Sequence, residues 1–304
     1  MSITVKNISK FYGKQKALDA VSFEIKSGEV VGFLGPNGAG KSTMMKIITG
    51  FIPANEGNVF VNSLNTDKNS LEVRKIVGYL PEHNPLYLDM YVKEYLSFVA
   101  SLHLPKKEIA KRVKDIIQMT GLSIEQNKKI GALSKGYRQR TGLAQALIHD
   151  PDVLILDEPT TGLDPNQIVE IRNLIGQIGK EKTIMLSTHI MQEVEAICDR
   201  IIIIDKGKII ADETPKSIKT SKGDKSTTII VEFDNVVKTE LLKNIEGVVK
   251  VEYHENNIWL LQSADNKDIR SNVFNFAVAN KMVILSMQKQ EKSLEEVFKI
   301  LTSS

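Results

Sequence analysis

A glycine-rich stretch at residues 35–43, GPNGAGKST, carries the strongest chemical signal in the chain. It follows the apolar run VVGFL and precedes MMKIITG, so it lies between a predicted strand and a predicted helix. The N–H groups of such a loop can turn toward phosphate oxygens, and the helix N-terminus adds partial positive charge. Lys41 would bridge the β- and γ-phosphates of a nucleotide, and the Ser42 hydroxyl would bind Mg²⁺. The candidate phosphate-binding residues are Gly35, Pro36, Asn37, Gly38, Ala39, Gly40, Lys41, Ser42 and Thr43.

Two adjacent carboxylates end a second apolar run, in VLILDEPTTG. Ligands of an open parallel sheet bind beyond the carboxyl ends of its strands, so Asp157 and Glu158 should face the phosphate loop. Asp157 would hold Mg²⁺ through its water shell, and Glu158 would polarise the water that attacks the γ-phosphate. The alternative is that both acids only solvate a strand end or cap the next helix.

His189 follows the apolar run TIMLS, and it also ends a predicted buried strand. Its imidazole could reach the γ-phosphate or orient Glu158 and the water. A histidine in this position is by default a hydrogen-bonded loop residue, but three strand ends that meet at one edge favour the catalytic interpretation. Asp164, in TGLDP, could be an ordinary acid at a helix start before Pro165.

These residues need a sheet that brings the strand ends together. Residues 3–34 alternate apolar and polar and contain turn signals, which predicts strands. Residues 92–121 change to helical spacing. The runs DVLILDEP, KTIMLSTH and RIIIIDKGKII are typical of buried parallel strands, and the first two precede helical segments. The main domain is therefore expected to be α/β.

The composition is that of an ordinary globular protein, with 304 residues, 42% hydrophobic and 25% charged. A net charge of +3 over 40 basic and 37 acidic residues gives no argument for nucleic-acid binding. No apolar run reaches the roughly 20 residues of a membrane span, and no signal peptide is apparent. The single cysteine, Cys198, excludes an internal disulfide. We expect a cytoplasmic chain with two domains.

A polar, lysine-rich segment at 216–225 predicts a linker between the two domains. Beyond it, residues 226–304 show the order β-α-β-β-α-β followed by a last helix, SLEEVFKILT. This order predicts a small α+β ferredoxin-like accessory domain. Trp259 is expected to be a core or interface aromatic.

Five motifs follow one another along the chain: the phosphate loop, LSKGYRQR, VLILDEP, TGLDP and STH. With these motifs in this order, the chain resembles the ATP-binding subunit of an ATP-binding-cassette (ABC) transporter. The resemblance covers roughly residues 3–215. It implies a P-loop ATPase domain at 1–215 with an antiparallel β subdomain, a RecA-like parallel core and a helical subdomain at about 83–150. It also implies that ATP is hydrolysed.

The resemblance assigns further roles. Tyr12, in FYGKQKAL, would stack on the adenine. Two copies would pack head to tail, so that Ser134 and the N–H of Gly136 bind the γ-phosphate held by the other copy. Asp164 would couple the two sites. Ser134 would also cap its own helix.

Two departures from the common family motifs stand out. Glu82, in VGYLPEHNP, occupies the place of a glutamine, and Lys135 and Tyr137 replace the usual glycine and glutamine of the signature. Glu82 could still accept hydrogen bonds or approach Mg²⁺. These variants resemble the ABC-2-type exporter branch, which includes drug, polysaccharide and gliding-motility systems. Within this branch, the narrowest interpretation is a gliding-motility ATP-binding subunit.

The implied partners are ATP with Mg²⁺, a second copy of the chain and a separate membrane permease, which would hold the chain at the inner face of the cell membrane. No nucleic acid is expected. The alternatives are a soluble ABC ATPase acting on ribosomes or DNA, and a regulatory module with little turnover, which Lys41, Glu158 and His189 disfavour. The permease would dock near EHNPLYLDMYVKEYL, although the loop residues Leu86, Tyr87, Leu88 and Met90 could instead face the core.

Overall fold

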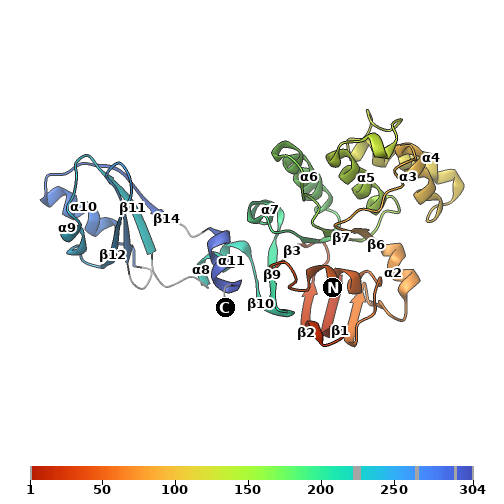
Figure 1. The fold of residues 1–304 in the computed structure, drawn as a ribbon, viewed down its shortest axis with the longest axis horizontal. Helices are drawn as coiled ribbons and strands as arrows, with labels where there is room; N and C mark the ends of the chain where they lie inside the picture. Colours follow the sequence, from red (N-terminus) through yellow and green to blue (C-terminus); the bar gives the residue numbers. More distant parts are fainter. Residues whose placement is uncertain (1, 222–226, 264–266, 291–292, 303–304) are drawn as a thin grey trace. The chain divides into compact units, whose positions relative to one another are not determined.

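The alternating N-terminal segment forms an antiparallel sheet in the computed structural model, which describes residues 2–221, 227–263, 267–290 and 293–302 (Figure 1). In strand β1, Ile3 pairs with Ile25 on one side and Val61 on the other, and alternate side chains turn inward. The sheet has the order β2-β1-β4-β5. Its strands are β1 (Ile3–Tyr12), β2 (Gln15–Ile25), β4 (Glu56–Val61) and β5 (Leu64–Asn65).

A second sheet of order β10-β9-β3-β8-β7-β6 carries the predicted site. Five strands are parallel, and every residue of β3, β7 and β8 is buried, which explains their continuous apolar sequence. The run RIIIIDKGKII differs from a single parallel strand, because the chain turns at Gly207 and its second half pairs antiparallel as β10. The strands are β3 (Val30–Leu34), β6 (Val77–Leu80), β7 (Val153–Asp157), β8 (Thr183–Ser187), β9 (Arg200–Asp205) and β10 (Lys208–Glu213).

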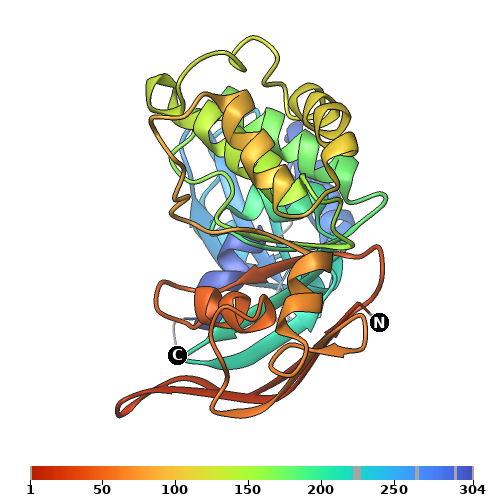
Figure 2. The same cartoon turned by 90° about the vertical axis from the view of Figure 1, so that its right-hand side faces the viewer.

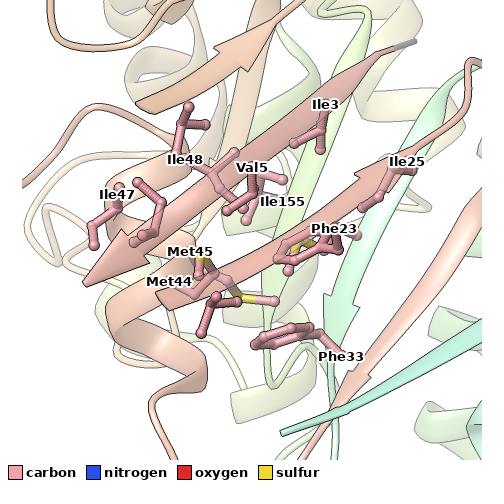
Figure 3. Close-up of a cluster of buried hydrophobic side chains, with 14 of the residues drawn as sticks. Ile3, Val5, Phe23, Ile25, Phe33, Met44, Met45, Ile47, Ile48 and Ile155 are labelled. Atoms are coloured by element: carbon pink, nitrogen blue, oxygen red, sulfur yellow. The ribbon is translucent and has the colours of Figure 1, made fainter. Parts of the chain in front are cut away.

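Helix α1 (Lys41–Ile48) lies in the core that the two sheets share. Its buried residues contact side chains of the antiparallel strands and of the parallel strands, as Figure 3 shows. Both Met44 and Met45 are fully buried although they are adjacent, because apolar residues surround the helix. The phosphate loop is therefore anchored in the hydrophobic core. The labelled core residues are Ile3, Val5, Phe23, Ile25, Phe33, Met44, Met45, Ile47, Ile48 and Ile155.

The remaining helices of this unit cover the sheet and form a helical layer. Within the expected helical subdomain, α3, α4 and α5 gather at one end, and strands β1 and β2 lie at the other (Figures 1 and 2). The parallel strands lie between them. The helices are α2 (Ser70–Ile76), α3 (Val92–Ser101), α4 (Lys106–Met119), α5 (Lys135–Leu147), α6 (Pro165–Ile178) and α7 (Met191–Ile197), with a 3₁₀ turn at Ile130–Ala132.

The chain divides into two compact units, Met1–Pro215 and Lys216–Ser304. Helix α8 (Pro215–Ser221) occupies the first part of the segment expected as a linker, and residues 222–226 lie outside the described ranges. None of the helices in the described ranges combines the length and the apolar run of a membrane span.

The second unit contains a four-stranded antiparallel sheet of order β12-β13-β11-β14, the arrangement of a ferredoxin-like fold. Alternate residues of β11, among them Phe233, enter a core that includes Trp259, only 3% exposed. Trp259 is thus a core aromatic, as expected. The elements are β11 (Thr227–Phe233), α9 (Thr239–Lys243), β12 (Val248–Tyr253), β13 (Ile258–Ser263), α10 (Arg270–Ala279), β14 (Ile284–Gln290) and α11 (Leu294–Thr302).

Candidate active site

Four neighbouring parallel strands bring the predicted site residues to one edge of the sheet. Strands β3, β8, β7 and β6 lie side by side in that order, and their carboxyl ends point the same way. The phosphate loop follows β3, His189 follows β8, Glu158 follows β7 and Glu82 follows β6. The strand order thus brings the phosphate loop and His189, more than 150 positions apart in the sequence, to the same edge.

A pocket of about 420 Å³ opens at this edge. Most of the predicted ATP-binding residues line it, and so does Glu158, the residue after β7. Gln15 and Ala17, at the start of β2, also line the pocket and were not predicted, because nothing in a surface hairpin sequence marks them. The lining residues are Tyr12, Gln15, Ala17, Asn37, Gly38, Gly40, Lys41, Ser42, Thr43, Glu82 and Glu158.

The phosphate loop needs glycine at its last turn. Gly40 has φ 110° and caps α1, and a Cβ at this position would lie 2.6 Å from the carbonyl oxygen of Ala17. Lys41 is 7% exposed, and its ammonium donates hydrogen bonds to the carbonyl oxygens of Gly35 at 2.7 Å and Pro36 at 3.3 Å. Two ammonium protons thus hold the loop closed on itself, and the third can serve a phosphate oxygen.

Asp157 and Glu158 share one partner, Ser187 of β8. The Ser187 hydroxyl donates to Oδ1 of Asp157 at 2.7 Å and accepts the N–H of Glu158 at 2.9 Å. Glu158 has φ 50°, a left-handed conformation that costs a non-glycine residue about 1 kcal/mol or more. Ser187 was not predicted as a site residue. Its position just before Thr188 and His189 was the available signal.

The Glu158 carboxylate is also fixed from two sides. Nδ1 of His189 lies 2.8 Å from Oε2 of Glu158, and the hydroxyl of Thr161 donates to the same oxygen at 3.1 Å. A carboxylate only accepts, so the proton between them sits on Nδ1 of His189. Glu158 is 8% exposed, whereas the His189 side chain is 61% exposed. The site therefore combines a buried, oriented carboxylate with an accessible imidazole.

Tyr12 and Glu82 approach the same pocket from different elements. The Tyr12 ring is 51% exposed, and the ammonium of Lys10 lies 5.6 Å from its centre. Glu82 reaches the pocket from the segment after β6. The negative charges of Asp157 and Glu82 add to burial, the main cause, in raising the pKa of Tyr79 above its ordinary value. Glu82 and Glu158 both line the pocket, which therefore has an acidic side.

Ser134 and Gly136 lie elsewhere in the same unit. Ser134 is exposed and caps α5, accepting the N–H of Tyr137 at 3.4 Å. Gly136 is buried, and a Cβ there would lie 2.5 Å from the Gln167 side chain. The Lys135 ammonium packs against Gly162. A Cβ added at residue 162 would lie 1.9 Å from this ammonium. Among the described residues that line the 420 Å³ pocket, neither Ser134 nor Gly136 appears.

Asp164 caps α6 by accepting the N–H of Gln167 at 3.0 Å. Since the Gln167 side chain packs on Gly136, the predicted coupling residue and the predicted signature are connected within one chain. The expected helix-start role of Asp164 is present in the structure. Gln167 was missed, because its place on an exposed helix turn looked ordinary.

A second cavity of about 720 Å³ lies beside the segment after β6. Of the four loop residues named above, Leu86 is buried at 9% exposed, whereas Tyr87 and Leu88 are 56% and 50% exposed. The cavity is lined instead by the preceding residues Pro81, His83 and Pro85. Other lining residues are Lys46, Thr49, Gly50, Phe51, Arg74, Val77, Tyr79, Val99, His103, Gln145, Ala146 and His149.

Comparison with known proteins gives a consistent result. A family model described as "ABC transporter" matches residues 18–161. The linearmycin resistance ATP-binding protein LnrL of Bacillus subtilis is 33% identical over 99% of this chain and 98% of the relative. The bacitracin transport ATP-binding protein BcrA of Bacillus licheniformis is 32% identical over 98% of this chain and 97% of the relative.

Solved structures agree with the sequence relatives. A dimeric, post-hydrolysis structure of the ATP-binding cassette MJ0796 bound to ADP and Pi superposes with a TM-score of 0.65 at 28% identity, covering 70% of this chain and 98% of that one. The fold class expected from the sequence is confirmed, and the alternative of a ribosome- or DNA-acting ATPase is not supported. The chain therefore belongs to the ABC transporter family, as an ATP-binding and ATP-hydrolysing subunit.

Proposed function

We propose that two copies of this chain sandwich two Mg-ATP and use their hydrolysis to drive export through a separate ABC-2-type permease. The observation that carries the proposal is the convergence of the phosphate loop, Glu82 and the Glu158–His189 pair at one sheet edge. The chain would act at the inner face of the cell membrane, held there by its permease.

In the proposed reaction, Glu158 accepts a proton from the attacking water. The hydrogen bonds from Thr161 and His189 hold its carboxylate in one orientation, and burial keeps competing water away. His189, already in contact with Glu158, would also contact the γ-phosphate and so align the bound phosphate with the base. Lys41 neutralises charge on the β- and γ-phosphates.

Ser42 and Asp157 would hold Mg²⁺, which would neutralise phosphate charge when bound. Their oxygen atoms, with Glu82 nearby, are the donor type that this ion prefers. Mg²⁺ usually completes its shell with phosphate and water.

The second copy would complete each site. Ser134 is exposed at a helix N-terminus, where an N–H array and partial positive charge favour a phosphate. Because Ser134 and Gly136 lie outside their own pocket, a head-to-tail partner is the simplest source of a phosphate for them. Asp164 would contact the partner at the same interface.

The transport role is the part that rests on relatives. The names of LnrL and BcrA refer to linearmycin resistance and bacitracin transport, and both align with nearly the whole chain. We infer an exporter of a drug-like compound. The gliding-motility role stays a narrower prediction, which these relatives do not favour. The ferredoxin-like unit after residue 225 is proposed as an accessory domain.

Replacement of Glu158 by glutamine tests the proposal. Glu158→Gln should retain ATP binding, lower hydrolysis by roughly 100-fold or more, and accumulate an ATP-bound dimer. Phosphate release and size-exclusion chromatography with ATP measure the two effects. Glu181→Gln, at an exposed position, is the matched control. Normal turnover by Glu158→Gln would exclude Glu158 as the base.

A further inference from the structure

The segment from β8 into α7 contains a buried carboxylate that the proposed mechanism does not use. Glu193, in the first turn of α7, is only 2% exposed. Its Oε2 accepts a hydrogen bond from the hydroxyl of Thr188 at 2.9 Å. Its Oε1 is buried and has no hydrogen-bond partner among the described residues. An unpaired buried acceptor lowers stability, so stability alone does not explain an acid at this position.

Thr188 closes a turn around His189. The Thr188 side chain is fully buried, and its hydroxyl accepts the N–H of Ile190 at 3.1 Å. A bond from a hydroxyl to the N–H two residues later fixes the backbone of the residue between them, which here is His189. Since the hydroxyl has one proton, donation to Glu193 leaves its lone pairs for Ile190. Glu193 also holds the far end of the turn, because its N–H donates to the carbonyl oxygen of Ile190 at 3.1 Å.

The imidazole of His189 depends on this turn for its direction. Its side chain is 61% exposed, so packing contributes little to its position, yet Nδ1 lies 2.8 Å from Oε2 of Glu158. Successive side chains of an extended segment point to opposite sides. Ser187 and His189 accordingly reach the end of β7, whereas Thr188 reaches α7. The side chain that touches Glu158 is therefore aimed by a backbone that Thr188 and Glu193 hold.

We propose that Thr188 and Glu193 are positioning residues for ATP hydrolysis, whose hydrogen bond fixes the turn that holds the imidazole of His189 against Glu158. Neither Thr188 nor Glu193 is among the described residues that line the 420 Å³ pocket, so their effect should fall on kcat and not on KM for ATP. This inference rests on the proposed roles of Glu158 and His189 and adds the contacts that align them.

Two substitutions at Thr188 separate its hydroxyl from its shape. Thr188→Val keeps the branched side chain but removes the hydroxyl, and it should lower kcat by about tenfold while KM for ATP changes by less than about twofold. Thr188→Ser keeps the hydroxyl and should stay within about twofold of the wild-type kcat. Phosphate release by the full chain, measured over a range of Mg-ATP concentrations, gives both constants.

Thr120→Val is the matched control for loss of a buried hydroxyl. Thr120 is also fully buried, and its hydroxyl donates to the carbonyl oxygen of Ile116 within α4. Urea unfolding measures the stability of Thr120→Val and Thr188→Val, and only Thr188→Val should lose kcat. An equal loss of kcat in the two variants would assign the effect to stability and overturn the positioning role.

A double-mutant cycle tests whether the two residues act through one hydrogen bond. Glu193→Ala removes the acceptor of the Thr188 hydroxyl and should lower kcat by about tenfold, and Thr188→Val/Glu193→Ala should be no slower than the slower single variant. Glu193→Gln keeps an oxygen that can accept from Thr188, so its kcat should stay within about threefold of wild type. The Glu193→Gln and Thr188 variants decide the question if Glu193→Ala does not fold.

Three further results would overturn the proposal: a wild-type kcat in Thr188→Val, a change confined to KM, or a loss in the double variant that equals the product of the two single losses. Glu158→Gln reports separately on the proposed function. If it abolishes hydrolysis while Thr188→Val keeps the wild-type kcat, the base is correct and the positioning role is wrong. Normal turnover by Glu158→Gln would instead contradict the proposed function itself.

Discussion

The carboxyl edge of the parallel sheet and the N-terminus of α5 hold the two groups of predicted ATP-binding residues, and they differ in how their polar atoms are satisfied. At the sheet edge, the carboxylates of Asp157 and Glu158 accept hydrogen bonds from Ser187, Thr161 and His189. At α5, Ser134 caps its helix but remains exposed. The polar groups of the first region are satisfied within the chain, whereas Ser134 and Gly136 of the second region do not line the pocket of their own chain.

This difference predicts complementation between variants. Lys41→Ala removes the phosphate-loop charge and Ser134→Arg blocks the signature, so each alone should lower hydrolysis by roughly 100-fold or more. In a mixture, a mixed dimer combines the intact Lys41 of one copy with the intact Ser134 of the other. Hydrolysis should rise by roughly tenfold or more above either variant, measured as phosphate release.

Nucleotide binding provides the control for the mixture. Ser134→Arg should still bind ATP as an isolated chain, because its own phosphate loop is unchanged. If the mixed sample hydrolyses no more ATP than the separate variants, the two regions do not form one site in trans.

Removing the Ser187 hydroxyl tests how firmly the sheet edge is assembled. Ser187→Ala leaves the N–H of Glu158 without its partner and should lower kcat by about 10- to 100-fold, with a loss of about 1–3 kcal/mol in the free energy of unfolding. Steady-state kinetics and urea unfolding measure both. The control is Thr183→Val on the same strand, which removes a hydroxyl that accepts a hydrogen bond from the N–H of Gly28, away from Glu158.

Thr183→Val should therefore lower stability and leave kcat near the wild-type value. Equal loss of kcat in the two variants would mean that strand stability, not the orientation of Glu158, explains the effect of Ser187.

Tyr12, at the rim of the pocket, should affect ATP hydrolysis less than the residues of the sheet edge. Tyr12→Ala removes the proposed stacking surface and should raise KM for ATP by about tenfold with little change in kcat, because stacking acts equally on bound substrate and transition state. Tyr12→Trp should restore KM. A KM that stays unchanged in Tyr12→Ala would assign base contact to another residue.

The smallest expected effect is that of His149 on stability, and this residue lies outside both the sheet edge and the N-terminus of α5. Burial, with help from His103, lowers the pKa of His149 from 6.5 to about 4, so this ring is neutral when folded and protonates more readily when unfolded. Its stabilising effect is complete above about pH 6.5 and is lost as pH falls toward 4, by roughly 1–2 kcal/mol because the ring is only partly buried.

Thermal unfolding between pH 7 and 4 measures this loss. His149→Gln should flatten the pH dependence, and His254→Gln, at an exposed position, should not. An unchanged pH profile in His149→Gln would assign acid sensitivity to other groups.

Motif spacing predicted the main elements because each motif ends a buried strand or starts a helix. The apolar runs before Gly35, Asp157 and Thr188 became neighbouring strands, and the split βαβ order of the second unit appeared in its sheet. Strand order itself had to come from the structure, since β3 pairs with β8 and β9 rather than with strands nearer in sequence.

Side-chain partners were less predictable. Ser187 looks like the last residue of a buried strand, and only its register opposite Asp157 shows that its hydroxyl links two carboxylate residues. The cavity of about 720 Å³ brings together His103 and His149, which lie 46 positions apart and carry no motif. Long-range packing decides such contacts, and local patterns do not record it.

The contact between Gly136 and Gln167 has a genetic consequence. A side chain at Gly136 would displace Gln167, whose N–H is held by Asp164. A single missense change would therefore disturb the N-termini of two helices, α5 and α6. Positions 136 and 167 should therefore vary together in evolution. A larger residue at position 136 should be tolerated only when a smaller residue stands at position 167.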